Sequence, residues 1–403
     1  MRRSYKFLLR PTARQAAALA ACVEDHRQLY NAALQERRDA YKMCGVGVRY
    51  GDQSAQLKDI RAADPDGQGR WSAGSQQQTL RRLDKAMAAF FRRVKSGERP
   101  GYPRFKGTGW FDSVEWPAEK NGARWDSTPH NSATRVYLLG VGHVRVHQHR
   151  PVAGTAKTVS VKREGDRWYV ILSCDGVPAE PLPATGTVVG VDMGVTHFLT
   201  TSDGEHVANP KYLKASAGRL ADAQRAVAAF PRFRRSLRTA RQRRAAEKVT
   251  RLHRKVRRQR LDHAHKTALA LVRGHDFIAA EGLNVAGMVR RAKPKPDPEQ
   301  PGTYLPNGQA AKSGLNKSIL DAGWGVFLGV LHAKAGWAGR VVVEVDPANT
   351  SRTCAACGHR AAENRRTQAE FVCVACGHTA HADVNAAVNI LRAGLALQVA
   401  HAA

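Results

Sequence analysis

The segment Thr187-Val188-Val189-Gly190-Val191-Asp192-Met193-Gly194 decides how this chain of 403 residues is interpreted. Its first residues form a short apolar run that predicts a buried strand, and Asp192 lies at the end of that run. A buried carboxylate is costly unless it binds a cation or a hydrogen-bond donor, so Asp192 is a candidate functional residue. The alternative is an aspartate that accepts hydrogen bonds from backbone amides. A second strand is predicted at His197–Thr201.

Two more acids lie at the ends of predicted elements farther along the chain. Glu281 directly follows the predicted strand Asp276–Ala280, and Asp383 precedes the predicted helix Val384–Leu391. Taken alone, Glu281 could be an exposed acid at a strand end, and Asp383 could be a helix N-cap. The position of all three acids at element ends nevertheless makes them a candidate set.

The order of the predicted elements gives this set a chemical meaning. A predicted strand at Arg340–Val345 follows a predicted helix over 318–337, and the whole region runs β-β-β-α-β-α. This is the ribonuclease H arrangement, in which three carboxylates converge on two divalent cations that hydrolyse a phosphodiester. Oxygen ligands favour Mg²⁺ or Mn²⁺. No Ser–His or Cys–His pair competes clearly as a nucleophile, and no Walker loop supports ATP-driven chemistry.

Four of the seven cysteines form a second constellation. They occur as two CxxC pairs separated by fifteen residues, at Cys354, Cys357, Cys373 and Cys376. Four thiolates on two tight turns suit one tetrahedral zinc ion, and a shell closed by four protein ligands is structural and not catalytic. Gly358 and Gly377 follow each pair, where such a turn needs positive φ. Free buried cysteines or an iron–sulfur cluster are the alternatives. Paired CxxC motifs also indicate a reducing compartment.

The charge of the chain predicts its partner. Lys and Arg number 64 and Asp and Glu 34, a net charge of +30, which favours nucleic acid. An anionic membrane is the alternative, but no run approaches the length of a spanning helix, and the first ten residues lack the apolar core of a signal peptide.

Basic residues concentrate in a predicted helical pair over 212–272. Residues 232–260 hold fourteen Lys or Arg and one acid, and an apolar stripe leaves one face able to pack. The candidate nucleic-acid contacts there are Arg251, Arg254, Lys255 and Arg258. The alternative is a solvated charged helix.

The remainder of the chain divides by pattern. A strand at 4–9 precedes predicted helices over 12–43 and 76–95, and residues 104–182 form a β module that we expect to be a small barrel. The proline-rich residues 291–316 are predicted to be a flexible loop.

Six short blocks resemble the TnpB (OrfB) family of transposon-encoded RNA-guided DNA endonucleases, which are related to compact type V CRISPR effectors. The resemblance spans nearly the whole chain. Its marks are Leu83-Asp84-Lys85-Ala86 with Phe90-Phe91, Gly101-Tyr102-Pro103-Arg104-Phe105-Lys106, Gly190-Val191-Asp192-Met193-Gly194, Asp321-Ala322-Gly323-Trp324-Gly325, Thr350-Ser351-Arg352-Thr353-Cys354 and Ala382-Asp383-Val384-Asn385-Ala386-Ala387.

The resemblance implies a multidomain α+β chain. It comprises a wedge β-barrel, a helical recognition domain and a RuvC-like α/β nuclease core of ribonuclease H type that is interrupted by a zinc ribbon. The expected boundaries are 1–10 and 104–184 for the wedge, 11–103 for the recognition domain, 185–350 and 379–403 for the nuclease core, and 351–378 for the ribbon.

By motif, Asp192, Glu281 and Asp383 fall on the family's catalytic carboxylates, which hold two Mg²⁺ or Mn²⁺ ions, and the four cysteines fall on its zinc ligands. Gln77, and more loosely Tyr50, fall where the family contacts a short target-adjacent DNA motif; surface or helix-packing roles are the alternative. The longer segment 291–316 departs from the family pattern.

The implied partners are a guide RNA from the transposon end and target double-stranded DNA, bound by one protein monomer per RNA in the nucleoid region of a prokaryotic cytoplasm, with no membrane. Guide pairing supplies sequence specificity. Three alternatives stay open: a compact type V CRISPR effector, distinguished by a neighbouring CRISPR array; a binding-only regulator, distinguished by a nuclease assay with Mg²⁺; and a transposase, which would need demonstrated strand transfer.

Overall fold

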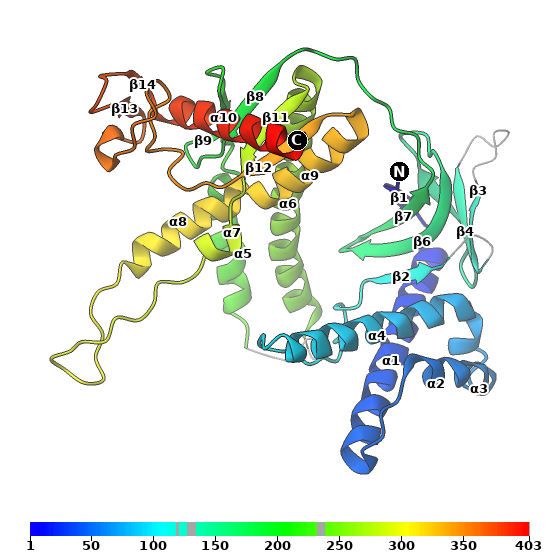
Figure 1. Ribbon diagram of the computed structural model, residues 1–403. Coiled ribbons are helices and arrows are strands. Elements are labelled where there is room, and N and C mark those ends of the chain that lie inside the picture. Colours follow the sequence, from blue (N-terminus) through cyan, green and yellow to red (C-terminus); the bar gives the residue numbers. More distant parts are fainter. Residues whose placement is uncertain (118–120, 127–133, 232–237, 403) are drawn as a thin grey trace. The chain divides into compact units, whose positions relative to one another are not determined.

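A computed structural model of the chain describes residues 1–117, 121–126, 134–231 and 238–402. The chain forms two compact units, Met1–Pro178 and Ala179–Ala403, and each is described by itself. Figure 1 shows the elements of both units in sequence colours.

The N-terminal unit contains a seven-stranded antiparallel sheet in the order β2-β6-β7-β1-β5-β4-β3. Alternate side chains of its strands are buried, as in β1, where Tyr5, Phe7 and Leu9 enter the core. No hydrogen-bonded pairing joins β2 to β3 in the described part of the chain, so the expected barrel closure stays a prediction. The strands are β1 (Arg3–Arg10), β2 (Ser113–Trp116), β3 (Ala123–Asp126), β4 (Arg135–Leu138), β5 (Gly142–His147), β6 (Thr155–Glu164) and β7 (Arg167–Asp175).

Four α-helices of the same unit lie between β1 and β2 in the chain. They are α1 (Ala13–Cys44), α2 (Tyr50–Ala55), α3 (Leu57–Ala63) and α4 (Ala73–Lys95). Helix α1 begins with a capping box, in which Thr12 and Gln15 bond each other's backbone N–H groups, and it ends at Gly45 with φ +67°. The two long helices were predicted from their apolar spacing, whereas α2 and α3 were not.

The C-terminal unit is built on a five-stranded mixed sheet in the order β10-β9-β8-β11-β12. Strands β8, β11 and β12 are parallel, and β9 runs antiparallel to both β8 and β10. The strands are β8 (Val188–Asp192), β9 (His197–Thr201), β10 (His206–Ala208), β11 (Phe277–Glu281) and β12 (Val341–Val345).

Strand β11, which lies between β8 and β12, is buried on both faces. Ile278 and Ala280 pack with α6 (Ala240–Gly274) and α9 (Trp324–Ala338), while Phe277 and Ala279 pack with the C-terminal helix α10 (Ala382–Ala402). A strand covered on both sides reads as a continuous apolar run, which is why Phe277–Ala280 lacks polar alternation.

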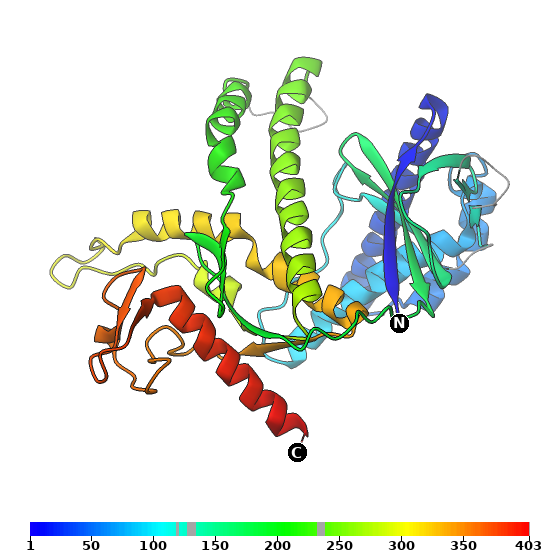
Figure 2. The same cartoon turned by 90° about the horizontal axis from the view of Figure 1, so that it is seen from above.

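Two long helices, α5 (Tyr212–Ala228) and α6 (Ala240–Gly274), lie side by side, as Figures 1 and 2 both show. This confirms the predicted helical pair. Residues 232–237, where the basic run begins, lie outside the described residues. The short helix α7 (Val285–Met288) follows β11.

The predictions for 291–316 and 318–337 were partly wrong. The last residues of the proline-rich segment already belong to helix α8 (Gln309–Ala322), and the expected single helix is divided into α8 and α9 (Trp324–Ala338). Gly323 joins the two with φ +76°, a conformation that ends α8 as a left-handed cap.

Helix α10 (Ala382–Ala402) lies very close to the sheet because glycines remove side chains at the contact. A Cβ on Gly190 of β8 would lie 2.0 Å from the carbonyl oxygen of Ala387, and one on Gly394 would lie 2.5 Å from the Cβ of Ala279. Two short strands, β13 (Glu370–Val372) and β14 (Thr379–His381), pair just before α10. Within the described residues, no helix has the length and apolarity needed to cross a membrane.

Candidate active site and zinc site

The strand register brings Asp192 and Glu281 to the same edge of the sheet. Val191 pairs with Ala280 between the parallel strands β8 and β11, so the residues that follow each of them are neighbours. Because side chains alternate along a strand, Asp192 shares a face with Gly190, and Glu281 shares a face with Ala279. Gly190 and Ala279 both face α10, so Asp192 and Glu281 lie on the same face of the sheet, the one that α10 covers.

The third acid comes from that covering helix. Asp383 lies in the first turn of α10, and the backbone N–H of this residue donates to Nδ1 of His381, 3.3 Å away. The helix begins at Ala382, two residues earlier than predicted, and His381 is its capping side chain. Asp383 is 9% exposed and is free of the capping role that was its alternative interpretation.

The electrostatics of the site show that the three carboxylates interact. Burial, together with the negative charges of Glu281 and Asp383, raises the pKa of Asp192 to about 7, against the opposing effect of the positive charge of Arg365. Burial also raises the pKa of Glu281, against the effect of a hydrogen bond from Thr350 and the charge of Arg365. Like charges in a poorly solvated site disfavour ionisation, so the site has an unmet demand for positive charge.

Two side chains partly stabilise the negative charges, one as a cation and one as a hydrogen-bond donor. Arg365 places Nη2 3.1 Å from Oδ1 of Asp383, and the hydroxyl of Thr350 donates to Oε1 of Glu281 over 2.6 Å. Thr350 and Asp383 are both buried. Neither Arg365 nor Thr350 was selected from the sequence. Arg365 is followed by a second arginine, Arg366, and no spacing rule in the sequence tells which of the two reaches the acidic site.

The donor set of the acidic site fits a hard divalent cation. All three side chains offer carboxylate oxygens, and they come from two strand ends and one helix start. Among the described residues they are not gathered as tightly as the cysteine ligands below.

The four cysteines do form a compact cluster. Their sulfur atoms all lie within 4.8 Å of one another, with Cys354–Cys376 at 3.7 Å and Cys357–Cys373 at 3.6 Å. Tetrahedral zinc with Zn–S bonds of about 2.3 Å places its sulfurs about 3.8 Å apart. Gly358 and Gly377 have φ values of +77° and +72°, as the spacing predicted. The geometry fits one structural Zn²⁺.

Polar contacts fasten the cysteine region to α10. Asn385 accepts from the backbone N–H of Ala355 and donates to the carbonyl of Thr353, both over 2.8 Å. Asn389 donates to the carbonyls of Thr350 and Thr353. Since α10 carries Asp383 and this region carries Arg365, the cysteine cluster and the acidic site share one framework.

The two candidate DNA-contact residues of the N-terminal unit lie near each other at the junction of α2 and α4. Gln77 donates to Oγ of Ser54 over 3.4 Å, and Nε of Arg81 donates to the hydroxyl of Tyr50 over 3.2 Å. The guanidinium of Arg81 also lies 5.2 Å from the centre of the Tyr50 ring. These contacts are consistent with helix packing, so a DNA-contact role stays a prediction.

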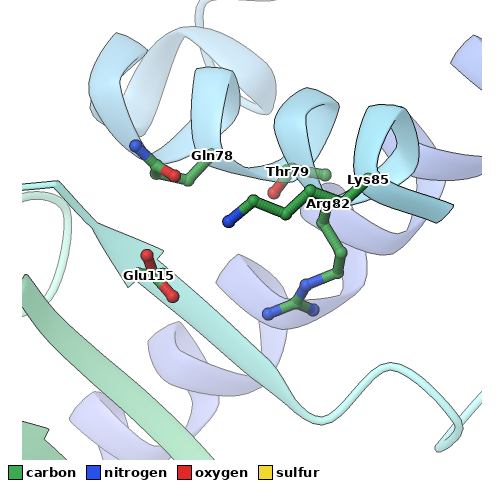
Figure 3. A pocket seen from close by; sticks show the side chains of 5 residues that line it. All are labelled: Gln78, Thr79, Arg82, Lys85 and Glu115. Carbon is green, nitrogen blue, oxygen red and sulfur yellow. The ribbon is translucent and has the colours of Figure 1, made fainter. Parts of the chain in front are cut away.

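A small cavity of about 190 Å³ lies beside this face of α4. Figure 3 shows the Lys85 side chain extending from α4 toward Glu115 of β2, with Gln78 and Arg82 on the same side of the helix. Arg82 also donates to the backbone and hydroxyl of Ser113, and its guanidinium packs on the ring of Phe111. This arginine therefore links α4 to β2.

The four basic candidates on α6 differ in exposure. Arg251, Lys255 and Arg258 are exposed, whereas Arg254 is half-buried and pairs with Glu247. Their contact with nucleic acid stays a prediction.

Known proteins support a specific family. Residues 1–45 match the profile described as a helix-turn-helix domain of IS605 OrfB, residues 158–292 match its probable transposase profile, and residues 324–390 match the Cas12f1-like TNB domain. The chain is 33% identical over 398 residues to the "Putative RNA-guided DNA endonuclease InsQ" of Escherichia coli K12, covering 98% of this chain and 92% of the relative. The chain belongs to the TnpB (OrfB) family.

A second TnpB-family relative, from Streptomyces pristinaespiralis, bears the name "Putative RNA-guided DNA endonuclease" and is 31% identical over 98% of this chain and 90% of its own length. Solved structures are more distant. The mini-RNA-guided endonuclease CRISPR-Cas_phi3 is 11% identical with a TM-score of 0.46, covering 98% of this chain and 92% of its own. The Cas12f1–sgRNA–target DNA complex is 16% identical with a TM-score of 0.35, covering 97% and 99%.

Proposed function

We propose that this TnpB-family chain is an RNA-guided DNA endonuclease of an insertion-sequence transposon. The observation that carries the proposal is the approach of Asp192, Glu281 and Asp383 on one covered face of the C-terminal sheet, where Asp192 is held with a pKa of about 7. The names of its full-length relatives support the same activity.

We also propose that the C-terminal sheet is a RuvC-like nuclease core. Its strand order, with the second strand antiparallel to its neighbours and the last two strands parallel to the first, is the order expected of a ribonuclease H fold. The cysteine cluster is then a zinc ribbon within that core, the N-terminal sheet is the wedge, and α1 to α4 are the recognition domain.

The three carboxylates would hold two Mg²⁺ or Mn²⁺ ions. When bound, such ions supply a nucleophilic hydroxide and neutralise the charge that develops on the leaving oxygen of a phosphodiester. The residues of this chain hold the site in place. Strands β8 and β11 fix Asp192 and Glu281, α10 fixes Asp383, and Thr350 orients the Glu281 carboxylate through its hydrogen bond.

Basic residues would bind the nucleic acids. A net charge of +30 attracts RNA and DNA phosphates without reading their sequence, and base pairing with a guide supplies specificity. The guide RNA would come from the transposon end, and one protein monomer would bind each RNA.

One experiment tests this function most directly. RNA that copurifies with the protein is sequenced, and a plasmid library matching that RNA is then offered with Mg²⁺. Guide-dependent cutting beside a short common motif is the expected result. A protein that retains RNA and binds matched DNA without cutting it would instead be a binding-only regulator.

A further inference from the structure

A cavity in the N-terminal unit, apart from the acidic site, is lined by arginines and aromatic residues. It measures about 660 Å³ and is lined by four arginines and two aromatic residues, together with Pro100, Gly101 and Pro103. The side chains are Arg38, Arg93, Arg99, Arg104, Tyr102 and Phe105. No acidic residue is among the described residues that line it.

The guanidinium groups of these four arginines have no protein partner among the described residues. Within the described residues, none of the four guanidinium groups makes an ion pair or a side-chain hydrogen bond, although the chain pairs many of its other arginines. Four unpaired cations around one hollow repel each other, so the arrangement is favourable only when an anion enters. A guanidinium suits phosphate in particular, because its N–H groups match two phosphate oxygens.

The two rings are exposed where they would ordinarily be buried. Tyr102 and Phe105 are each 43% exposed, and nearby Phe91 and Trp110 are 54% and 80% exposed. Exposed rings interleaved with arginines are typical of surfaces that stack on unpaired bases, because each base has a π-face and each phosphate a charge.

The segment that carries the rings is fastened at both ends. The ring of Phe90 in α4 packs edge-on against Tyr102, with centroids 5.3 Å apart. At the other end, the N–H of Lys106 donates to Asn31 over 2.8 Å, and its carbonyl accepts from Arg27 and Asn31. Pro100 and Pro103 further restrict the backbone. The hollow is therefore formed before any ligand arrives.

We propose that this cavity binds an unpaired nucleotide of a single-stranded nucleic acid. Tyr102 and Phe105 stack on the base, and the four arginines contact the phosphates on either side. The inference rests on the proposed function, which supplies two single strands, the guide RNA and the displaced DNA strand. A duplex offers only its phosphates to such a site, because its bases are already stacked on each other.

The test uses the full-length protein freed of copurified RNA, with fluorescently labelled oligouridine, oligothymidine and a DNA duplex of equal length. Replacing one ring, as in Tyr102→Ala, should weaken single-strand binding about tenfold, and the double variant with Phe105→Ala by more, while duplex binding changes less than about twofold. Tyr102→Phe, which keeps the ring, should bind as the wild type does. Both rings are exposed, so equal melting temperatures will show that the variants fold.

Two further variants complete the design. Arg93→Ala with Arg104→Ala should reduce the slope of log affinity against log salt by about 1.4 for single strands. Tyr304→Ala removes a more exposed ring, 67% accessible, from the C-terminal unit and should leave all binding unchanged. A loss confined to oligouridine assigns the cavity to RNA, a loss confined to oligothymidine assigns it to the displaced DNA strand, and a loss for both supports the site for either.

Unchanged single-strand binding by the double ring variant would overturn the proposal. So would an equal loss for single strands, duplex and heparin, which would indicate a general polyanion surface. Guided cleavage by the wild type distinguishes failure of the nucleotide site from failure of the proposed function. If the wild type cuts guided DNA and the rings have no effect, only the nucleotide site is wrong; if the wild type binds no RNA or DNA, the proposed function itself is wrong.

Discussion

The guanidinium of Arg365 lies 3.1 Å from the carboxylate of Asp383, and this ion pair joins the cysteine-rich segment to the helix that carries the third acid. Arg365 also lowers the pKa of Asp192 and Glu281 against the effect of burial. One arginine therefore offsets part of the repulsion among three carboxylates that the sheet and α10 hold together.

Removal of this arginine should destabilise the protein when no divalent cation is bound. Arg365→Ala leaves the acids without their nearest counter-charge, so we expect the melting temperature in Mg²⁺-free buffer to fall by a few degrees. Saturating Mg²⁺ should recover most of the loss. The exposed neighbour Arg366 provides the matched control, Arg366→Ala. Equal melting temperatures for the two variants would show that the ion pair contributes nothing.

Substitution of Asp192 should separate cutting from binding. Asp192→Ala removes a carboxylate that would hold the divalent ions, so we expect guided cleavage to be abolished while RNA and DNA binding persist. Gel-shift and plasmid-cleavage assays measure the two properties. Asp222→Ala, at an exposed acid of α5, should cut normally. Retained cutting by the Asp192 variant would contradict the site.

Loss of one zinc ligand should release the metal and loosen the ribbon. Cys357→Ser should reduce bound zinc from one ion per chain to none, and proteolysis should then cleave residues 351–378 faster, because the metal closes that segment. Cys44→Ser, at an exposed cysteine outside the cluster, should change neither property. Metal analysis that finds no zinc in the wild type would remove the assignment.

The N-terminal unit should lose stability in mild acid through His26. Burial, together with the nearby charge of Arg82, lowers the pKa of this histidine to about 4, although a hydrogen bond to the carbonyl of Cys22 opposes the shift. Below its ordinary pKa of 6.5 the unfolded chain binds a proton that the folded chain refuses. Stability should therefore be complete above that value and fall as the pH drops toward 4, by about 1.4 kcal/mol per pH unit.

Denaturant unfolding at several pH values measures this dependence. His26→Gln should reduce the slope of the unfolding free energy against pH by about 1.4 kcal/mol per pH unit, the contribution of one proton. His143→Gln, at an exposed histidine of the same unit, should leave that slope unchanged. Parallel slopes for the wild type and His26→Gln would exclude His26 as the titrating group.

A buried acid should matter more to stability than an exposed one. Asp321 is 7% exposed and accepts hydrogen bonds from Arg260 over 2.6 Å and from the backbone N–H of Leu213 over 2.9 Å, which joins α5, α6 and α8. Asp321→Ala should cost about 3 kcal/mol. Glu344→Gln, in a half-exposed pair with His332, should cost less than about 1 kcal/mol. Similar losses for both would refute the distinction.

The sequence predicted those features that local chemistry dictates. The CxxC spacing located the cysteine cluster, and acids at the ends of apolar runs located Asp192 and Glu281, because both signals are written within a few residues. Long amphipathic helices such as α1 and α6 followed from their apolar periodicity.

Features set by distant contacts were missed. Helices α2 and α3 are short and polar and are held by contacts such as that between Gln53 and Arg37, 16 residues away. The ion pair of Arg365 depends on how the cysteine-rich segment folds back on α10. The division at Gly323 was missed because Trp324–Ala338 continues the apolar pattern of the preceding helix.

Gly190 sets the gap between β8 and α10, and hence how far Asp383 stands from Asp192. A methyl group there would lie 2.0 Å from the backbone of Ala387, so even alanine must displace the helix. Inactive forms of this nuclease could therefore be made without removing any acidic group, by a substitution at Gly190 that pushes α10 away from the sheet. Such a variant would keep every charge of the wild type, which makes it a cleaner tool for holding guided DNA uncut than a charge-deleting substitution.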